Sequence, residues 1–142
     1  MKKRHLPGFT LVELMVVMLI LAILAALVIP RLIGRTEQAK VSGATTDVAT
    51  FSNALQMFRL DCGRYPTTEE GLEALRTAPS DVQGKWRGPY TEKAIPSDPW
   101  GNPYHYTYPG TGGKDTFEVT SYGKDGQPGG TGDDEDIIGG SG

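Results

Sequence analysis

An almost unbroken apolar segment near the N-terminus constrains this chain more than any other feature. The segment runs over 21 residues, 9–29, and Glu13 is its only charged residue. A helix rises about 1.5 Å per residue, so this length covers about 30 Å, the thickness of the hydrocarbon core of a bilayer. We therefore predict a membrane-spanning helix. A carboxylate in such a helix costs ~2.5 kcal/mol or more on insertion scales, so Glu13 indicates a function and needs a partner.

Two simpler interpretations of this segment each leave something unexplained. A cleaved secretory signal peptide fits the basic start, but its apolar region is about 7–15 residues long. The small-residue sequence Leu24-Ala25-Ala26 also lies inside the apolar run instead of after it. An uncleaved signal anchor explains everything except Glu13. Neither interpretation gives the carboxylate a role.

Charge and composition limit the rest of the chain. Lys2, Lys3 and Arg4 precede the apolar segment, which favours a cytoplasmic N-terminus and a periplasmic C-terminal domain. Losing these three residues would take the net charge from −3 to −6 and leave no basic stripe, so no nucleic-acid partner is expected. The 142 residues allow one anchor helix and one small domain. Cys62 is the only cysteine, which excludes an intramolecular disulfide.

The apolar segment continues into an amphipathic helix. Pro30 and Gly34 mark a weak point, but an apolar stripe with alternating spacings of three and four residues then follows. Its members are Val41, Ala44, Val48, Phe51, Leu55 and Phe58. We predict one long helix from about residue 10 to about residue 61, ended by Gly63, with the stripe buried against the C-terminal domain.

The region that follows predicts an α+β domain, residues 30–142 including the second half of the long helix. Thr67 and Glu70 have capping-box spacing, so we expect a short helix over about 68–76 with Leu72 and Leu75 buried. Residues 80–103 are rich in proline and aromatic residues and predict an ordered irregular loop. Two strands are expected over about 104–108 and 116–122.

The sequence around the start of the apolar segment resembles a known processing signal. Gly8-Phe9-Thr10-Leu11-Val12-Glu13-Leu14 resembles the type III signal of type IV pilins and pseudopilins. This resemblance implies that residues 1–8 are a leader, that a prepilin peptidase cuts after Gly8, and that the new N-terminus at Phe9 is methylated. It also implies that Glu13 pairs with the N-terminus of an adjacent subunit during filament assembly.

Three later segments, 61–72, 86–90 and 95–104, resemble the signature of the major pseudopilins of type II secretion systems, the general secretion pathway protein G family. The resemblance implies a type IV pilin-like fold and a structural subunit of a periplasmic pseudopilus that drives folded exoproteins through the outer-membrane secretin. It implies self-association, with minor pseudopilins and an inner-membrane assembly platform as further partners. The alternatives are a type IV pilin for adhesion or motility and a membrane-tethered calcium-binding module that does not polymerise.

The glycine-rich segment 122–137 ends in clustered acidic residues. Its composition alone favours a disordered acidic tail. However, it directly follows a predicted strand, and its glycines permit the tight backbone that brings carbonyl oxygens to Ca²⁺, which takes about 6–8 oxygen ligands. Its spacing is not that of an EF-hand. The segment resembles the calcium loop of G-type pseudopilins, which implies carboxylate ligands from Asp125, Asp134 and Asp136, with Asp133 as an alternative, and carbonyl ligands from Tyr122, Gln127 and Thr131.

Catalytic motifs are not evident in the sequence. After leader cleavage His105 would be the one remaining histidine, and it lies in a predicted strand among tyrosines. We find no nucleophile motif around a serine or cysteine, no zinc-ligand spacing and no phosphate-binding loop. The sequence therefore predicts a structural protein and not an enzyme.

Overall fold

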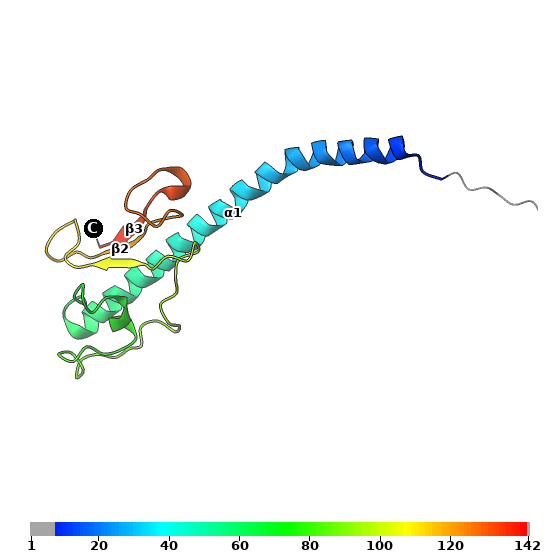
Figure 1. Cartoon of the computed structure of the whole chain (residues 1–142). Helices are drawn as coiled ribbons and strands as arrows, with labels where there is room; N and C mark the ends of the chain where they lie inside the picture. The colour runs from blue at the N-terminus through cyan, green and yellow to red at the C-terminus, as the bar shows by residue number, and fades with distance from the viewer. Residues whose placement is uncertain (1–7, 142) are drawn as a thin grey trace, which may run out of the picture. The chain divides into compact units, whose positions relative to one another are not determined.

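The computed structural model describes residues 8–141, except for the side chains of residues 29–33. The predicted leader, apart from Gly8, lies outside the described residues. The elements in chain order are α1 (Leu11–Cys62), η1 (Leu72–Leu75), β1 (His105–Thr107), β2 (Glu118–Ser121), η2 (Gly132–Asp134) and β3 (Ile137–Gly140) (Figure 1). The chain divides into two units, the first ending at Glu37 and the second beginning at Gln38.

Helix α1 confirms the prediction of one long helix. It contains 52 residues, and the helical assignment continues through Pro30, which was part of the predicted weak point. The helix ends as predicted at Gly63, whose φ of 81° lies in the left-handed region and whose N–H donates to the carbonyl of Arg59 at 2.8 Å. This arrangement satisfies a carbonyl that the helix end would otherwise leave free.

The predicted apolar stripe forms the floor of the core in the second unit. Its residues from Ala44 to Phe58 are buried, and Val41 is half-buried. From Val48 onward, the stripe residues pack with apolar residues from η1, the loops and the sheet, among them Leu72, Leu75, Val82, Tyr106, Phe117 and Val119. Each large apolar side chain buried in this way contributes about 1.5–3 kcal/mol, so the stripe holds the domain on the second half of α1.

The short helix predicted over 68–76 is wrong in type and length. The structure has a four-residue 3₁₀ helix, η1, preceded by turns. The capping box itself forms: the Thr67 N–H donates to the Glu70 carboxylate at 2.8 Å, and the Glu70 N–H donates to the Thr67 hydroxyl at 3.2 Å. Gly71 follows with a φ of 59°, which interrupts helical geometry directly after the box. Leu72 and Leu75 are buried, as predicted.

Strands β1, β2 and β3 form an antiparallel sheet in that order. The first two occupy the predicted positions but are shorter than expected, and β3 was not predicted. It lies beside β2, with Thr120 opposite Ile138 (Figure 1). Strand β3 packs so closely on α1 that a Cβ on Gly139 would collide with Val48. The glycines of this segment disfavour a strand by propensity, but the close packing of β3 requires them.

The segment 80–103 contains no helix or strand, as predicted. It is held by specific hydrogen bonds: the Trp86 indole donates to the carbonyl of Ala74 at 3.0 Å, and the Tyr90 N–H donates to that of Leu75 at 2.8 Å. The Arg64 guanidinium also donates to both oxygens of Glu70 and to Asp81 at the start of this segment. These donated hydrogen bonds lower the pKa of the Glu70 carboxyl.

Candidate functional site

The first half of α1 carries an apolar surface that the described residues do not cover. Residues Leu11–Val28 have a mean hydropathy of 3.0, and none of this stretch is buried. Phe9, just before it, is 83% exposed. A single helix of this length and composition fits a membrane span, and so large an exposed apolar surface indicates contact with lipid or with other apolar helices.

Glu13 lies in the first turn of α1, where the helix dipole favours a negative charge. Its backbone N–H donates to the Thr10 hydroxyl at 3.2 Å, so Thr10 caps the helix. The spacing of these two residues is that of a capping box, in addition to the one predicted at Thr67 and Glu70. Among residues 8–141, no ion pair involves the Glu13 carboxylate. Its charge is therefore available to a partner beyond the described residues.

The second candidate site, the loop over 122–137, is folded back on itself. The Lys124 N–H donates to the Asp133 carbonyl at 3.3 Å. Gly130, at a φ of 98°, approaches the Asp134 carbonyl so closely that a Cβ would collide with it. Gly123, at a φ of 63°, lies against the carbonyl groups of Asp134 and Glu135. The acidic end of the loop therefore lies against its beginning.

The predicted carboxylate ligands occupy different positions around this loop. Asp136 is half-buried, and its Oδ2 accepts the Gly129 N–H at 2.8 Å. Asp125 is exposed, and its Oδ1 accepts the Gln127 N–H at 3.0 Å. Asp134 is half-buried at the end of η2, whereas the alternative ligand Asp133 is exposed.

The predicted carbonyl ligands lie along the same loop. The Thr131 carbonyl accepts the Asp134 N–H at 3.4 Å and keeps a second lone pair. Tyr122, directly after β2, is half-buried, and Gln127 is exposed. In the part of the chain that the structure describes, no three Asp, Glu, His or Cys side chains form a ready-made metal site. The ligand set therefore stays a prediction and depends on the carbonyls.

One atom in this loop fits a cation. Asp136 Oδ1 is buried and has no hydrogen-bond partner. An unsatisfied polar group in this position costs about 1–3 kcal/mol, and more when it is charged. The five acidic residues between 125 and 136 also repel one another. A hard cation with oxygen ligands would satisfy the free oxygen and relieve the repulsion, so the donors present fit Ca²⁺.

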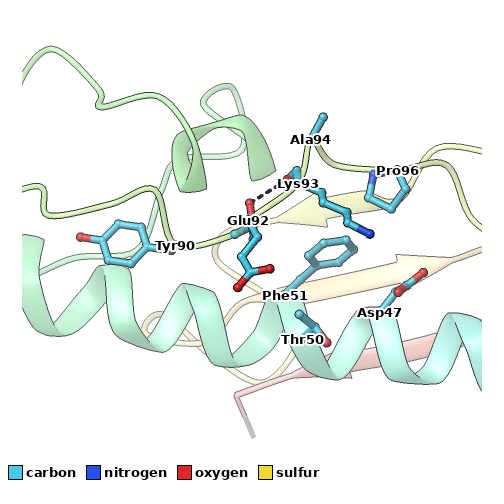
Figure 2. Close-up of a pocket in the computed structure, with 9 residues that line it drawn as sticks. Asp47, Thr50, Phe51, Tyr90, Glu92, Lys93, Ala94 and Pro96 are labelled. Carbon is cyan, nitrogen blue, oxygen red and sulfur yellow. Dashed lines mark hydrogen bonds between the residues drawn. The ribbon is translucent and has the colours of Figure 1, made fainter.

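A groove of about 400 Å³ lies between α1 and the loop segment 90–96. Figure 2 shows Phe51 on its floor and the side chains of Glu92 and Lys93 directed from the loop toward the helix. The nine lining residues include no histidine, cysteine or serine. The groove thus offers an apolar surface with a charged rim.

Histidine and cysteine often serve in catalysis, but His105 and Cys62 pack against other parts of the domain. The exposed His105 ring stacks on Tyr122 with 4.2 Å between ring centroids. Cys62 is buried, and burial raises the pKa of its thiol, which disfavours the reactive thiolate.

Comparisons with known proteins identify the family. Residues 31–140 match the family described as "Type II secretion system (T2SS), protein G", and residues 7–29 match the prokaryotic N-terminal methylation motif. The chain is 48% identical over 139 residues to type II secretion system core protein G of Pseudomonas aeruginosa, covering 96% of both chains. It is 47% identical over 137 residues to the protein of the same name from Vibrio cholerae, covering 96% of this chain and 92% of the relative.

A solved structure agrees with these relatives. The crystal structure of the major pseudopilin from the type 2 secretion system of enterohaemorrhagic Escherichia coli matches with a TM-score of 0.59 and 38% identity. The match covers 77% of this chain and 93% of that one. The comparisons thus favour neither a type IV pilin nor a tethered module that does not polymerise. The chain belongs to the type II secretion system protein G family and is a pseudopilin, a membrane-anchored structural subunit of the pseudopilus.

Proposed function

We propose that this chain is inserted with its N-terminus in the cytoplasm, cleaved after Gly8 by a prepilin peptidase and methylated at Phe9. The processed subunit then leaves the inner membrane and joins a periplasmic filament. The observation that carries this proposal is the exposed apolar stretch Leu11–Val28, which has a single acidic residue, Glu13, in its first turn and overlaps the processing motif. Apolar helices packed around it in the filament replace the lipid that covers it in the membrane.

Glu13 is the docking group in this proposal. New subunits arrive with a free amine at Phe9, and that amine is the cation available at the depth of Glu13. Desolvation opposes the pairing of two charges in an apolar bundle, so the pair contributes register more than stability. A subunit that is one turn out of register leaves both charges unpaired in the apolar bundle, which makes that register unfavourable.

Glu13→Gln tests this role against the simpler role of a helix cap. Glutamine also serves at the third position of a capping box, so the variant keeps the start of α1 but loses the charge. We expect normal membrane insertion, no filaments by electron microscopy and no secretion. Thr10→Val is the matched control, because it removes the cap and keeps the carboxylate, and it should still assemble. Normal filaments from Glu13→Gln would contradict the proposal.

The partners beyond the filament itself follow from the same proposal. An inner-membrane assembly platform adds subunits, and minor pseudopilins are further partners of the filament. Growth of the filament drives folded exoproteins through the outer-membrane secretin. The exposed surface of the second unit, including the groove at Phe51, is available for such contacts.

Calcium is the proposed cofactor of the loop. Asp125, Asp134 and Asp136, with the carbonyls of Tyr122, Gln127 and Thr131, would hold the ion, and Asp133 is the alternative carboxylate. Bound Ca²⁺ supplies a fixed positive charge that ties the acidic end of the loop to its beginning. It would stabilise a region that no disulfide can close, because Cys62 is the only cysteine. Support comes from the free buried oxygen of Asp136 and from the folded-back backbone.

A further inference from the structure

A buried carboxylate lies beside the calcium loop but outside it. Asp98 is 4% exposed and belongs to the irregular segment 80–103. Its Oδ1 accepts the N–H groups of Trp100 at 3.1 Å and Asn102 at 2.8 Å, and its backbone N–H donates to the Asn102 carbonyl at 2.8 Å. These bonds fix a tight turn over residues 98–102, and they offset the cost of taking the Asp98 carboxylate out of water.

The other oxygen of Asp98 reaches the sheet. Its Oδ2 accepts the hydroxyl of Ser121 at 2.6 Å, and Ser121 is fully buried as the last residue of β2. The Ser121 hydroxyl in turn accepts the N–H of Gly123 at 3.3 Å. A continuous chain of hydrogen bonds therefore runs from the turn to the first residues of the loop.

Asn102 makes a second link from the same turn. Its side-chain N–H donates to the Gly123 carbonyl at 3.0 Å. Gly126 lies against the same amide, because a Cβ built there would stand 3.0 Å from Asn102 Oδ1. The proposed ligand Asp125 lies between these two glycines in the chain, and the proposed carbonyl ligand of Tyr122 immediately precedes them.

We propose that Asp98 and Asn102 are positioning residues of the calcium loop. They hold the beginning of the loop in place without contacting the ion. The inference rests on the calcium site proposed above. The turn fixes the backbone at residues 123 and 126 from one side, while the acidic end of the loop approaches Gly123 from the other. With the turn in place, Asp125 and the Tyr122 carbonyl are set in position before the ion binds, which lowers the ordering cost of binding.

The test measures calcium affinity by titration calorimetry on the full chain in detergent micelles. Loss of groups that orient metal ligands typically weakens binding about 10–100-fold, and we expect that range for Asn102→Ala. The chain's other asparagine, Asn53, is exposed on α1, so Asn53→Ala is the matched control and should bind as the wild type does. Terbium luminescence lifetimes in H₂O and D₂O should show more water on the ion in Asn102→Ala.

Asn102→Asp distinguishes positioning from electrostatics. It keeps the size of the side chain but loses the N–H donor to Gly123. An added negative charge near a cation should tighten calcium binding, whereas loss of the hydrogen bond from Asn102 to Gly123 should weaken it. We expect weaker binding, and binding as tight as or tighter than the wild type would overturn the inference.

The outcomes separate this inference from the calcium proposal. If the wild-type chain binds no calcium, the site itself is refuted and the inference falls with it. If the wild type binds and Asn102→Ala binds equally well, only the positioning role is refuted. Circular dichroism in chelator should show an intact fold in both variants, because Asn102 is not part of the apolar core. Unfolding of both variants would also refute a role confined to the loop.

Discussion

Replacing Asp136 by asparagine tests the calcium site at its most diagnostic atom. Calcium that binds only the folded state stabilises it by RT ln(1 + [Ca²⁺]/Kd), about 2.7 kcal/mol at a hundredfold excess over Kd. In a domain of roughly 100 residues, each kcal/mol raises the Tm by about 4–8 °C, so calcium should raise the wild-type Tm by about 11–22 °C. Asp136→Asn keeps an oxygen to accept the Gly129 N–H but loses the charge, and most of this rise should disappear.

The same variant should behave differently without the ion. In chelator, the wild type holds a buried carboxylate oxygen with no partner, so Asp136→Asn should melt no lower than the wild type. The assay is thermal denaturation of the full chain in detergent, with calcium, magnesium or chelator. Magnesium should stabilise less, because it prefers a small octahedron and retains water. Glu135→Gln removes the same charge at an exposed residue of the loop that is not among the proposed ligands, and it is the control. An equal calcium-dependent rise in the Tm of Asp136→Asn and of the wild type would show that the Asp136 carboxylate does not hold the ion.

Two further predictions concern the fold. Gly139→Ala should destabilise the second unit by about 1–3 kcal/mol, measured by urea denaturation, because the new methyl group overlaps Val48. Adding Val48→Ala should restore part of this loss. If the effects of the two substitutions simply add, the proposed packing of β3 on Val48 is contradicted. Arg64→Ala should cost about 2 kcal/mol near neutral pH by removing hydrogen bonds to Glu70. The pKa of Glu70 is lower in the folded state than in the unfolded state, so this stabilisation is present above the unfolded-state pKa and is lost as the pH falls through the folded-state pKa. The unfolding free energies of the wild type and Arg64→Ala should therefore converge in acid. A gap that stays constant with pH would contradict this.

Local sequence patterns predicted the long helix and its buried face. The alternating spacing of three and four from Val41 to Phe58 has one structural solution, an amphipathic helix, and Gly63 marked its end because only glycine takes that backbone angle without strain. The capping box at Thr67 and Glu70 also formed as predicted. What followed it did not, because the φ of 59° at Gly71 breaks the helical backbone. A glycine's φ depends on tertiary packing and cannot be read from its neighbours.

Local sequence patterns could not predict strand β3 or the hydrogen bonds of Asp98. Ile137-Ile138-Gly139-Gly140 has two glycines, which disfavour a strand in isolation, and their reason is the proximity of Val48, some ninety residues earlier. Asp98 lies in a proline-rich loop, and its bond to Ser121 joins residues 23 apart. Both features arise from contacts between distant segments. The acidic residues of the loop were recognisable by type, but their register as ligands depends on how the loop closes.

In the proposed filament, Glu13 docks each subunit on the N-terminus of its neighbour. The direct measurement is a cryo-electron microscopy reconstruction of filaments made by cells that overproduce the full chain with its secretion system. We expect a chain that begins at Phe9, apolar helices packed along the filament axis, and the Glu13 carboxylate within hydrogen-bonding distance of the Phe9 amine of an adjacent subunit. A filament joined only through the second unit, or one in which Glu13 faces solvent, would contradict it.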